Sequence, residues 1–191
     1  FTYGKYYKNR INPGYAGLVG EYVYSSSYDK GEGYTSNEIR PATPLSETVN
    51  NLYVYNTGQA NVHFFIAASG NALYNRHIKV DINSTQVVDA VMNVFNDTRQ
   101  QATLPVSLIS AGSAVVKITN TSDNPNDRMV VSRYELTYPR QFNFGNVANF
   151  VFELPASDTG NFLRITNFNR GNVAPVLYDL SNRKRYVGDI S

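Results

Sequence analysis

Apolar and polar residues alternate along most of the chain, and the alternation restarts after each cluster of turn residues. A strand that buries one face and exposes the other to water shows this period of two. The clearest case is one face made of Val130, Ser132, Tyr134, Leu136 and Tyr138, opposite Val131, Arg133, Glu135 and Thr137. Strands are also predicted at residues 18–25, 49–56, 62–69, 76–82, 102–108, 114–118, 148–154, 162–168 and 176–180.

Residues 87–95 fit two kinds of element. Their apolar positions suit a short helix or a strand, but the β-branched residues and the neighbouring strands favour a strand. Outside this segment, one turn near residues 43–48 is the only further helical signal. The chain is therefore predicted to contain almost no helix.

Turn-forming residues separate the predicted strands, as in Asn12-Pro13-Gly14 and Asp158-Thr159-Gly160. The chain has 23 asparagines, mostly in these connectors, where the side chain mimics a turn. Many short strands joined by tight turns predict an all-β fold, a two-sheet antiparallel sandwich that is jelly-roll-like. The side chains predicted to fill its core include Val116, Ile118, Tyr134, Leu136, Phe150 and Phe152.

Length and composition fit one globular domain. The chain has 191 residues, with 42% hydrophobic and 17% charged, so a single β-sandwich domain is predicted over residues 1–191. The first residue is Phe1, and residues 186–191 read as an interrupted strand, so we expect a fragment of a larger secreted protein. No stretch approaches the ~20 apolar residues of a membrane helix, and no membrane insertion is predicted.

Cysteine is absent, and the net charge is only +2. The absence of cysteine excludes disulfides, thiolate zinc sites, iron–sulfur clusters and a cysteine nucleophile. The basic residues are spread along the chain, and the run of Arg183, Lys184 and Arg185 fits a solvated strand end better than a nucleic-acid patch. No nucleic-acid partner is predicted.

No catalytic centre is predicted from the residues. Only His63 and His77 could act as imidazole bases, both lie on predicted strands, and no Gly-x-Ser-x-Gly motif is present. Lys30-Gly31-Glu32-Gly33 places an acidic residue where a phosphate would sit. Paired carboxylates for glycoside hydrolysis do not stand out among the 15 acidic residues. The chain is predicted to be no enzyme and to need no cofactor.

Two polar turns offer oxygens that could bind calcium. One holds Asp123, Asn124, Asn126 and Asp127, and the other holds Asp29 and Glu32. Neither has the spacing of an EF-hand loop, and polar turns of this kind are ordinary. No metal site is predicted.

The strongest chemical signal is a cluster of tyrosines near the start of the chain. Tyr22 and Tyr24 share one face of a predicted strand, and Tyr28 and Tyr34 follow it. A tyrosine ring suits a protein interface or stacking on a sugar, and it also fills a core that lacks tryptophan. These four residues are the candidate partner- or glycan-binding site, with core packing as the plain alternative.

Three segments resemble a known family. Residues 20–36, with Gly20-Glu21-Tyr22-Val23-Tyr24, are similar to the stretch before the catalytic domain of gingipain-like cysteine peptidases, the sortase-like proteins of type IX secretion. Arg133-Tyr134-Glu135-Leu136-Thr137-Tyr138-Pro139-Arg140 resembles a later strand of that region, and Val176-Leu177-Tyr178-Asp179-Leu180 its closing strand. The family usually has tryptophan where this chain has Tyr178.

The resemblance implies a β-sandwich in front of a peptidase domain, in a protein exported to the cell surface or beyond. The family's nucleophilic Cys and its partner His lie in the following α/β domain, and this chain has no Cys, so no catalytic residue transfers to it. The first hypothesis is a non-catalytic accessory domain that packs on the peptidase domain or binds another secreted protein. The alternative is an independent surface adhesion or carbohydrate-binding sandwich, so a glycan stays open as a partner.

Overall fold

The computed structural model describes residues 2–9, 35–56, 61–154 and 156–189. The chain divides into two compact units, one reaching to Gln141 and the other made of residues 142–191. We describe each unit by itself. In the described part of the chain, no helix is long and apolar enough to cross a membrane.

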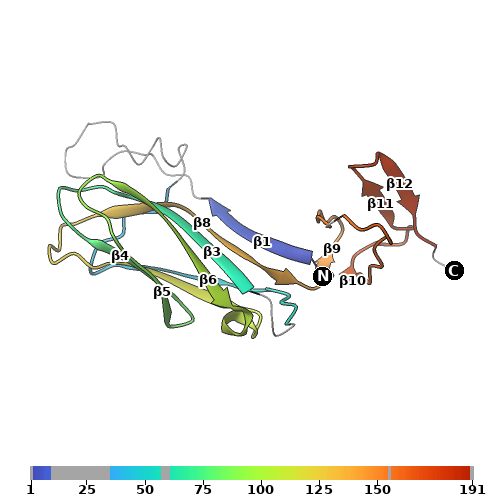
Figure 1. The fold of residues 1–191 in the computed structure, drawn as a ribbon, viewed down its shortest axis with the longest axis horizontal. Helices are drawn as coiled ribbons and strands as arrows, with labels where there is room; N and C mark the ends of the chain where they lie inside the picture. Colours follow the sequence, from blue (N-terminus) through green and yellow to red (C-terminus); the bar gives the residue numbers. More distant parts are fainter. Residues whose placement is uncertain (1, 10–34, 57–60, 155, 190–191) are drawn as a thin grey trace. The chain divides into compact units, whose positions relative to one another are not determined.

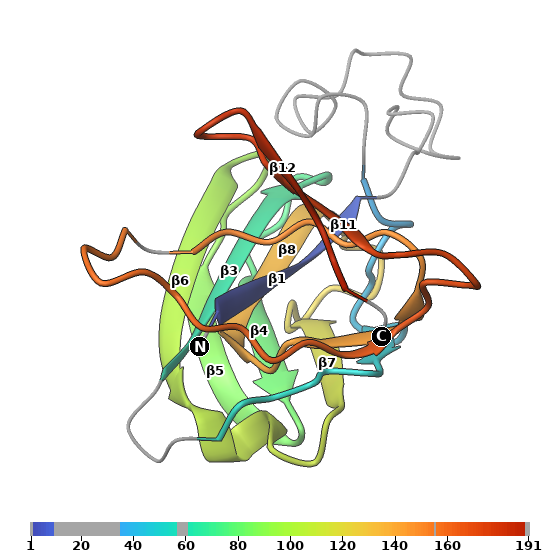
Figure 2. The same cartoon turned by 90° about the vertical axis from the view of Figure 1, so that its right-hand side faces the viewer.

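In its described residues, the first unit is a sandwich of two four-stranded sheets (Figures 1 and 2). The first sheet has the order β1-β8-β3-β6 and the second the order β2-β7-β4-β5. The strands are β1 (Thr2–Asn9), β2 (Leu45–Val49), β3 (Asn61–Gly70), β4 (His77–Ile82), β5 (Thr85–Val91), β6 (Asp97–Pro105), β7 (Ala114–Asn120) and β8 (Met129–Arg140). Among them, only β4 and β5 are neighbours in both sequence and sheet, so the chain crosses between sheets at the other connections.

The core lies between the two sheets. Phe64 and Ile66 of β3 face inward, as do Val80 and Ile82 of β4, and each is 0–1% exposed. The predicted core positions Val116, Ile118, Tyr134 and Leu136 are buried too. The ladders β3–β6, β3–β8, β4–β5, β4–β7 and β2–β7 are all antiparallel. The all-β sandwich prediction is therefore confirmed.

Strand β5 confirms the interpretation of residues 87–95 as far as Val91, after which the chain turns. The prediction for residues 49–56 is wrong. Leu52 and Val54 are buried as their alternation requires, but the ladder is broken because Asn51 adopts a left-handed φ of 60°. The strand lies earlier, at β2, and replaces the turn predicted near residues 43–48.

The strand predicted at residues 102–108 ends early. β6 stops at Pro105, and the 3₁₀ helix η2 (Val106–Ile109) follows. Proline has no N–H to donate, so it cannot extend a ladder. The helical turn places Val106 and Ile109, rather than Leu108, in the core.

Two buried polar pairs connect parts of the sandwich. Arg76, which precedes β4, binds Asp127 in the turn before β8, and both side chains are fully buried. Tyr134 of β8 donates its hydroxyl to Glu47 Oε2 of β2 at 2.9 Å and so links the two sheets. Buried polar groups need such partners because they have lost water.

The second unit has four short strands in the part that the structure describes. β9 (Asn143–Val147) pairs in parallel with β10 (Thr166–Phe168), and β11 (Val176–Asp179) forms an antiparallel hairpin with β12 (Lys184–Val187). The hairpin confirms the strand near residues 176–180. The prediction for residues 162–168 holds only for its last three residues.

The strand predicted at residues 148–154 is wrong, and Phe150 and Phe152 are half-buried rather than buried. Gly145 and Asn146 have left-handed φ values of 59° and 63°, which turn the chain out of an extended course. The rings then gather around Phe144: Phe150 stacks on it at 4.1 Å between centroids, and Phe152 lies at 5.8 Å. Packing among aromatic rings has replaced sheet pairing here.

Phe144 is the only buried hydrophobic residue that the structure describes in residues 142–191, whereas the first unit has 26. The second unit therefore has little core of its own. The prediction of one domain over residues 1–191 stays a prediction.

Candidate functional site

The outer face of the first sheet carries an ordered grid of side chains. Because strands alternate, the buried faces of β3, β6 and β8 leave every second residue pointing away from the core. The register places His63 between Thr103 and Thr137, Phe65 between Gln101 and Glu135, and Ala67 between Arg99 and Arg133. On this face, β3 thus has polar side chains of β6 on one side and of β8 on the other.

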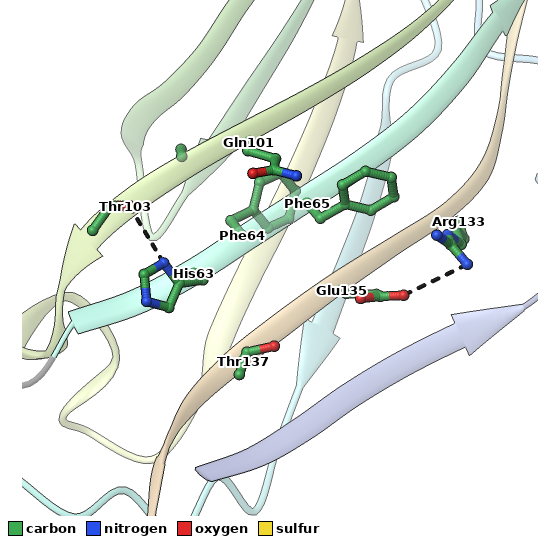
Figure 3. Close-up of a pocket in the computed structure, with 9 residues that line it drawn as sticks. His63, Phe64, Phe65, Gln101, Thr103, Arg133, Glu135 and Thr137 are labelled. Carbon is green, nitrogen blue, oxygen red and sulfur yellow. Dashed lines mark hydrogen bonds and ion pairs between the residues drawn. The ribbon is translucent and has the colours of Figure 1, made fainter.

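This face is hollowed around Phe65. A depression of about 420 Å³ lies over β3, β6 and β8, and we call it the outer-face depression. Its side chains come from His63 and Phe65 of β3, Gln101 and Thr103 of β6, and Arg133, Glu135 and Thr137 of β8 (Figure 3). Phe65 is half-buried, while His63, Gln101 and Thr103 are exposed.

Three contacts organise the outer-face depression. The Arg133 guanidinium lies over the Phe65 ring, 4.9 Å from the centroid, a cation–π arrangement. Arg133 Nη1 also lies 3.7 Å from Glu135 Oε1, so the two charges offset each other. His63 Nδ1 and Thr103 Oγ1 are 3.4 Å apart. The depression therefore combines an aromatic centre, balanced charge and several groups that can donate or accept hydrogen bonds.

The other histidine lies on the second sheet. His77 Nδ1 is 2.7 Å from Asp89 Oδ1, and Lys79 Nζ is 3.4 Å from Asp89 Oδ2. The hydrogen bond with His77 lowers the pKa of Asp89 below its ordinary 3.8, and Lys79 lowers it further. Among the described residues, no serine hydroxyl is hydrogen-bonded to the His77 ring, so this exposed cluster gives no basis for a catalytic triad.

The turn at residues 123–127 gives no cluster of metal ligands. Asp127 points inward to Arg76 and to the Asn120 amide, 3.0 Å away, so its carboxylate is already engaged. Asn124 Oδ1 accepts the backbone N–H of Asn126 within the turn itself. Within the described ranges, no three His, Cys, Asp or Glu side chains come together as a metal site. Asp29 and Glu32 lie outside the described residues.

A second feature is the apolar surface of residues 142–191. Of the 17 large hydrophobic side chains that are exposed in the described chain, 11 belong to this unit. Phe162 is 95% exposed, Val151 86% and Leu180 79%. Exposed apolar side chains that form a patch mark binding surfaces in soluble proteins.

The β11–β12 hairpin forms part of this apolar surface. Its register pairs Leu177 with Tyr186 on one face and Tyr178 with Arg185 on the other, and all four are exposed. The loop end is held by Asp179, which accepts the backbone N–H of Asn182 at 3.0 Å and its side-chain amide at 2.8 Å. Hydrogen bonds from Asn182 lower the pKa of Asp179.

The predicted tyrosine site, Tyr22, Tyr24, Tyr28 and Tyr34, lies outside the described residues and stays a prediction. Sequence reasoning missed the outer-face depression, although one signal was present. Phe65 follows Phe64 directly, so one of these two rings had to leave the core face. The cross-strand partners Gln101 and Glu135 follow from the register and could not be read from sequence.

No protein-family model matches the chain, and no curated protein matches it in sequence. Solved structures show distant similarity. Dimeric latent PorU from Porphyromonas gingivalis aligns with 75% of this chain at a TM-score of 0.49 and 7% identity, and the chain spans 13% of its length.

Two carbohydrate-binding modules are similar at a comparable level. The CBM36-1 domain of a multidomain xylanase from the hindgut metagenome of Trinervitermes trinervoides aligns with 70% of this chain, which covers 96% of that domain, at a TM-score of 0.41 and 9% identity. A CBM36 module in complex with calcium and xylotriose aligns with 70% of this chain, which covers 98% of that module, at a TM-score of 0.40 and 14% identity. Likenesses of this degree establish no family.

Proposed function

We propose that this chain is a non-catalytic accessory domain of a larger secreted protein and that residues 142–191 pack on a further domain of that protein. The observation that carries the proposal is the contrast between the two units. The first unit buries 26 hydrophobic residues in the described chain, whereas residues 142–191 bury one and expose 11 large ones.

The hairpin gives the proposal a physical basis. An isolated two-stranded hairpin is at best marginally stable in water. The β11–β12 hairpin exposes apolar residues on both faces, such as Leu177 on one and Tyr178 on the other. A partner surface that covers these side chains would supply the burial that the hairpin lacks.

The charges of the hairpin indicate what kind of surface would cover it. Arg183, Lys184 and Arg185 are exposed beside the apolar positions, and Asp179 is the only acidic residue of the hairpin. An apolar partner surface with an acidic rim would match this arrangement. The resemblance of residues 133–140 and 176–180 to gingipain-like peptidases favours a cysteine peptidase domain as the partner, in a protein at the cell surface or outside the cell.

A pair of leucine substitutions tests the proposal. Leu180 and Leu73 are 79% and 73% exposed, so Asp at either position should change the stability of this chain alone very little. In the full-length polypeptide encoded by the gene, Leu180→Asp should destabilise the docked hairpin by about 2 kcal/mol, because burying a leucine is worth that much. Leu73→Asp, in the first unit, is the matched control.

Urea titration read by limited proteolysis at residues 176–187 measures the difference. The proposal is supported if Leu180→Asp destabilises the hairpin in the full-length polypeptide and has little effect on stability in this chain alone. Equal effects of Leu180→Asp in both proteins would refute it, as would a gene that encodes no further domain.

A further inference from the structure

We infer that the outer-face depression is a binding site for a neutral oligosaccharide. This site lies in the first unit and uses none of the apolar surface of residues 142–191. It shares no residue with the predicted tyrosine site. Its volume of about 420 Å³ falls within the range of small-molecule sites.

The site rests on a rigid platform. β3 is paired on both sides, to β6 over nine residue pairs and to β8 over eight, so the side chains around Phe65 project from fixed backbone. The opposite face of β3 is locked into the core by Phe64 and Ile66. Little ordering would therefore be needed when a ligand binds, and preorganisation of this kind favours affinity.

The side chains suit a sugar. A sugar ring has an apolar C–H face and a rim of hydroxyls, so it needs an aromatic or apolar contact and mixed hydrogen-bonding partners. Phe65 supplies the ring, and Gln101, Thr103 and Thr137 supply an amide and two hydroxyls on its flanking strands. The guanidinium of Arg133 lies over the Phe65 ring, so a sugar that stacks there must displace it or lie against its outer plane.

The balance of charge selects a neutral ligand. Among the described residues, Arg133 is the one positive side chain that lines the depression, and the carboxylate of Glu135 lies 3.7 Å from it. His63 is exposed. A phosphate or an acidic sugar would meet Glu135 as well as Arg133, and repulsion from the carboxylate would offset the attraction. Anion sites instead use uncompensated basic groups or backbone N–H groups at helix N-termini.

The geometry also disfavours a peptide. Extended peptides usually bind to a sheet by adding a strand at an exposed edge. The outer-face depression lies over β3, whose two edges are already occupied by β6 and β8. A ligand there meets side chains rather than free backbone groups, which fits a saccharide chain laid across the sheet.

Titration followed by NMR tests the inference, with xylohexaose, cellohexaose and laminarihexaose as neutral probes. Hexagalacturonate and inorganic phosphate serve as anionic probes. We expect at least one neutral hexasaccharide to shift the resonances of His63, Phe65 and Gln101, with a Kd in the range of about 0.01–1 mM. Failure of all three neutral probes to shift these resonances would overturn the inference, as would equal or tighter binding of an anionic probe.

Variants show whether the depression itself binds. Gln101→Ala and Thr137→Val should each weaken binding about three- to tenfold, because each removes a hydrogen-bonding group. Thr119→Val is the matched control: Thr119 is half-buried like Thr137 but lies on β7 of the second sheet. Phe65→Leu, which keeps an apolar side chain but removes the ring, should weaken binding about tenfold with the fold intact. Unchanged binding in all three depression variants would contradict the site.

Discussion

Arg76 and Asp127 form a two-pronged ion pair inside the sandwich, with Nε and Nη2 of the guanidinium each 2.6 Å from a different carboxylate oxygen. The remaining N–H groups of Arg76 reach the backbone carbonyls of Ala72, Tyr74, Met92 and Val94. One buried side chain thus joins the connectors β3–β4, β5–β6 and β7–β8. Because the charge is paired and its donors are satisfied, the arginine can remain in the interior.

Replacing one member of this pair should therefore be costly. We expect Asp127→Ala to lower the free energy of unfolding by about 3–5 kcal/mol, since it leaves a buried guanidinium without its counter-charge. Asp123→Ala, at an exposed position of the same turn, should change it by less than about 0.5 kcal/mol. Urea denaturation of the two variants measures the difference, and equal values would show that the ion pair has no special role.

Gly70 is predicted to tolerate no side chain. A Cβ at this position would overlap the Val94 carbonyl oxygen and Nη1 of Arg76. Gly70→Ala should lower the free energy of unfolding by about 1–3 kcal/mol, the usual range for overpacking. Ser69→Ala is the neighbouring control and should be close to neutral, because the buried Ser69 hydroxyl makes no hydrogen bond to any described residue. Thermal unfolding followed by circular dichroism compares them, and a neutral Gly70→Ala would contradict this packing.

The pKa of Asp89 should report on the cluster with His77. The hydrogen bond with His77 holds that pKa below 3.8 in the folded chain. A carboxyl whose folded pKa is depressed stabilises the fold above its unfolded pKa, and this contribution is lost as the pH falls through the folded value. We expect His77→Ala to raise the pKa of Asp89, and His63→Ala to leave it unchanged. NMR titration of the Asp89 carboxyl carbon between pH 2 and 6 gives both values, and no rise in His77→Ala would refute the assignment.

Alternation of apolar and polar residues predicted burial better than it predicted strands. Leu52 and Val54 are buried as the pattern requires, yet left-handed backbone at Asn51 keeps them out of a continuous ladder. A period of two records which side faces the core, whereas a strand also needs a partner for its backbone groups. Such partners come from distant parts of the chain.

The outer-face depression shows the same limit. Phe65 breaks the pattern visibly, but its neighbours Gln101 and Glu135 lie 36 and 70 residues further along the chain, and only the strand register brings them to its sides. The sequence likewise could not show that Phe150 would stack on Phe144 instead of entering the sandwich core. Local sequence patterns predict individual strands, whereas the pairing of distant strands determines which side chains form a site.

Amide hydrogen exchange measures most directly whether another domain covers residues 142–191. Exchange at residues 176–187 is compared between this chain alone and the full-length polypeptide encoded by the gene, with the β3 core amides of Phe64 and Ile66 as internal references. We expect exchange in the hairpin to slow about a hundredfold in the full-length polypeptide, equivalent to ~2.7 kcal/mol, while exchange of the reference amides does not change. Equally fast exchange of the hairpin in both proteins would contradict it.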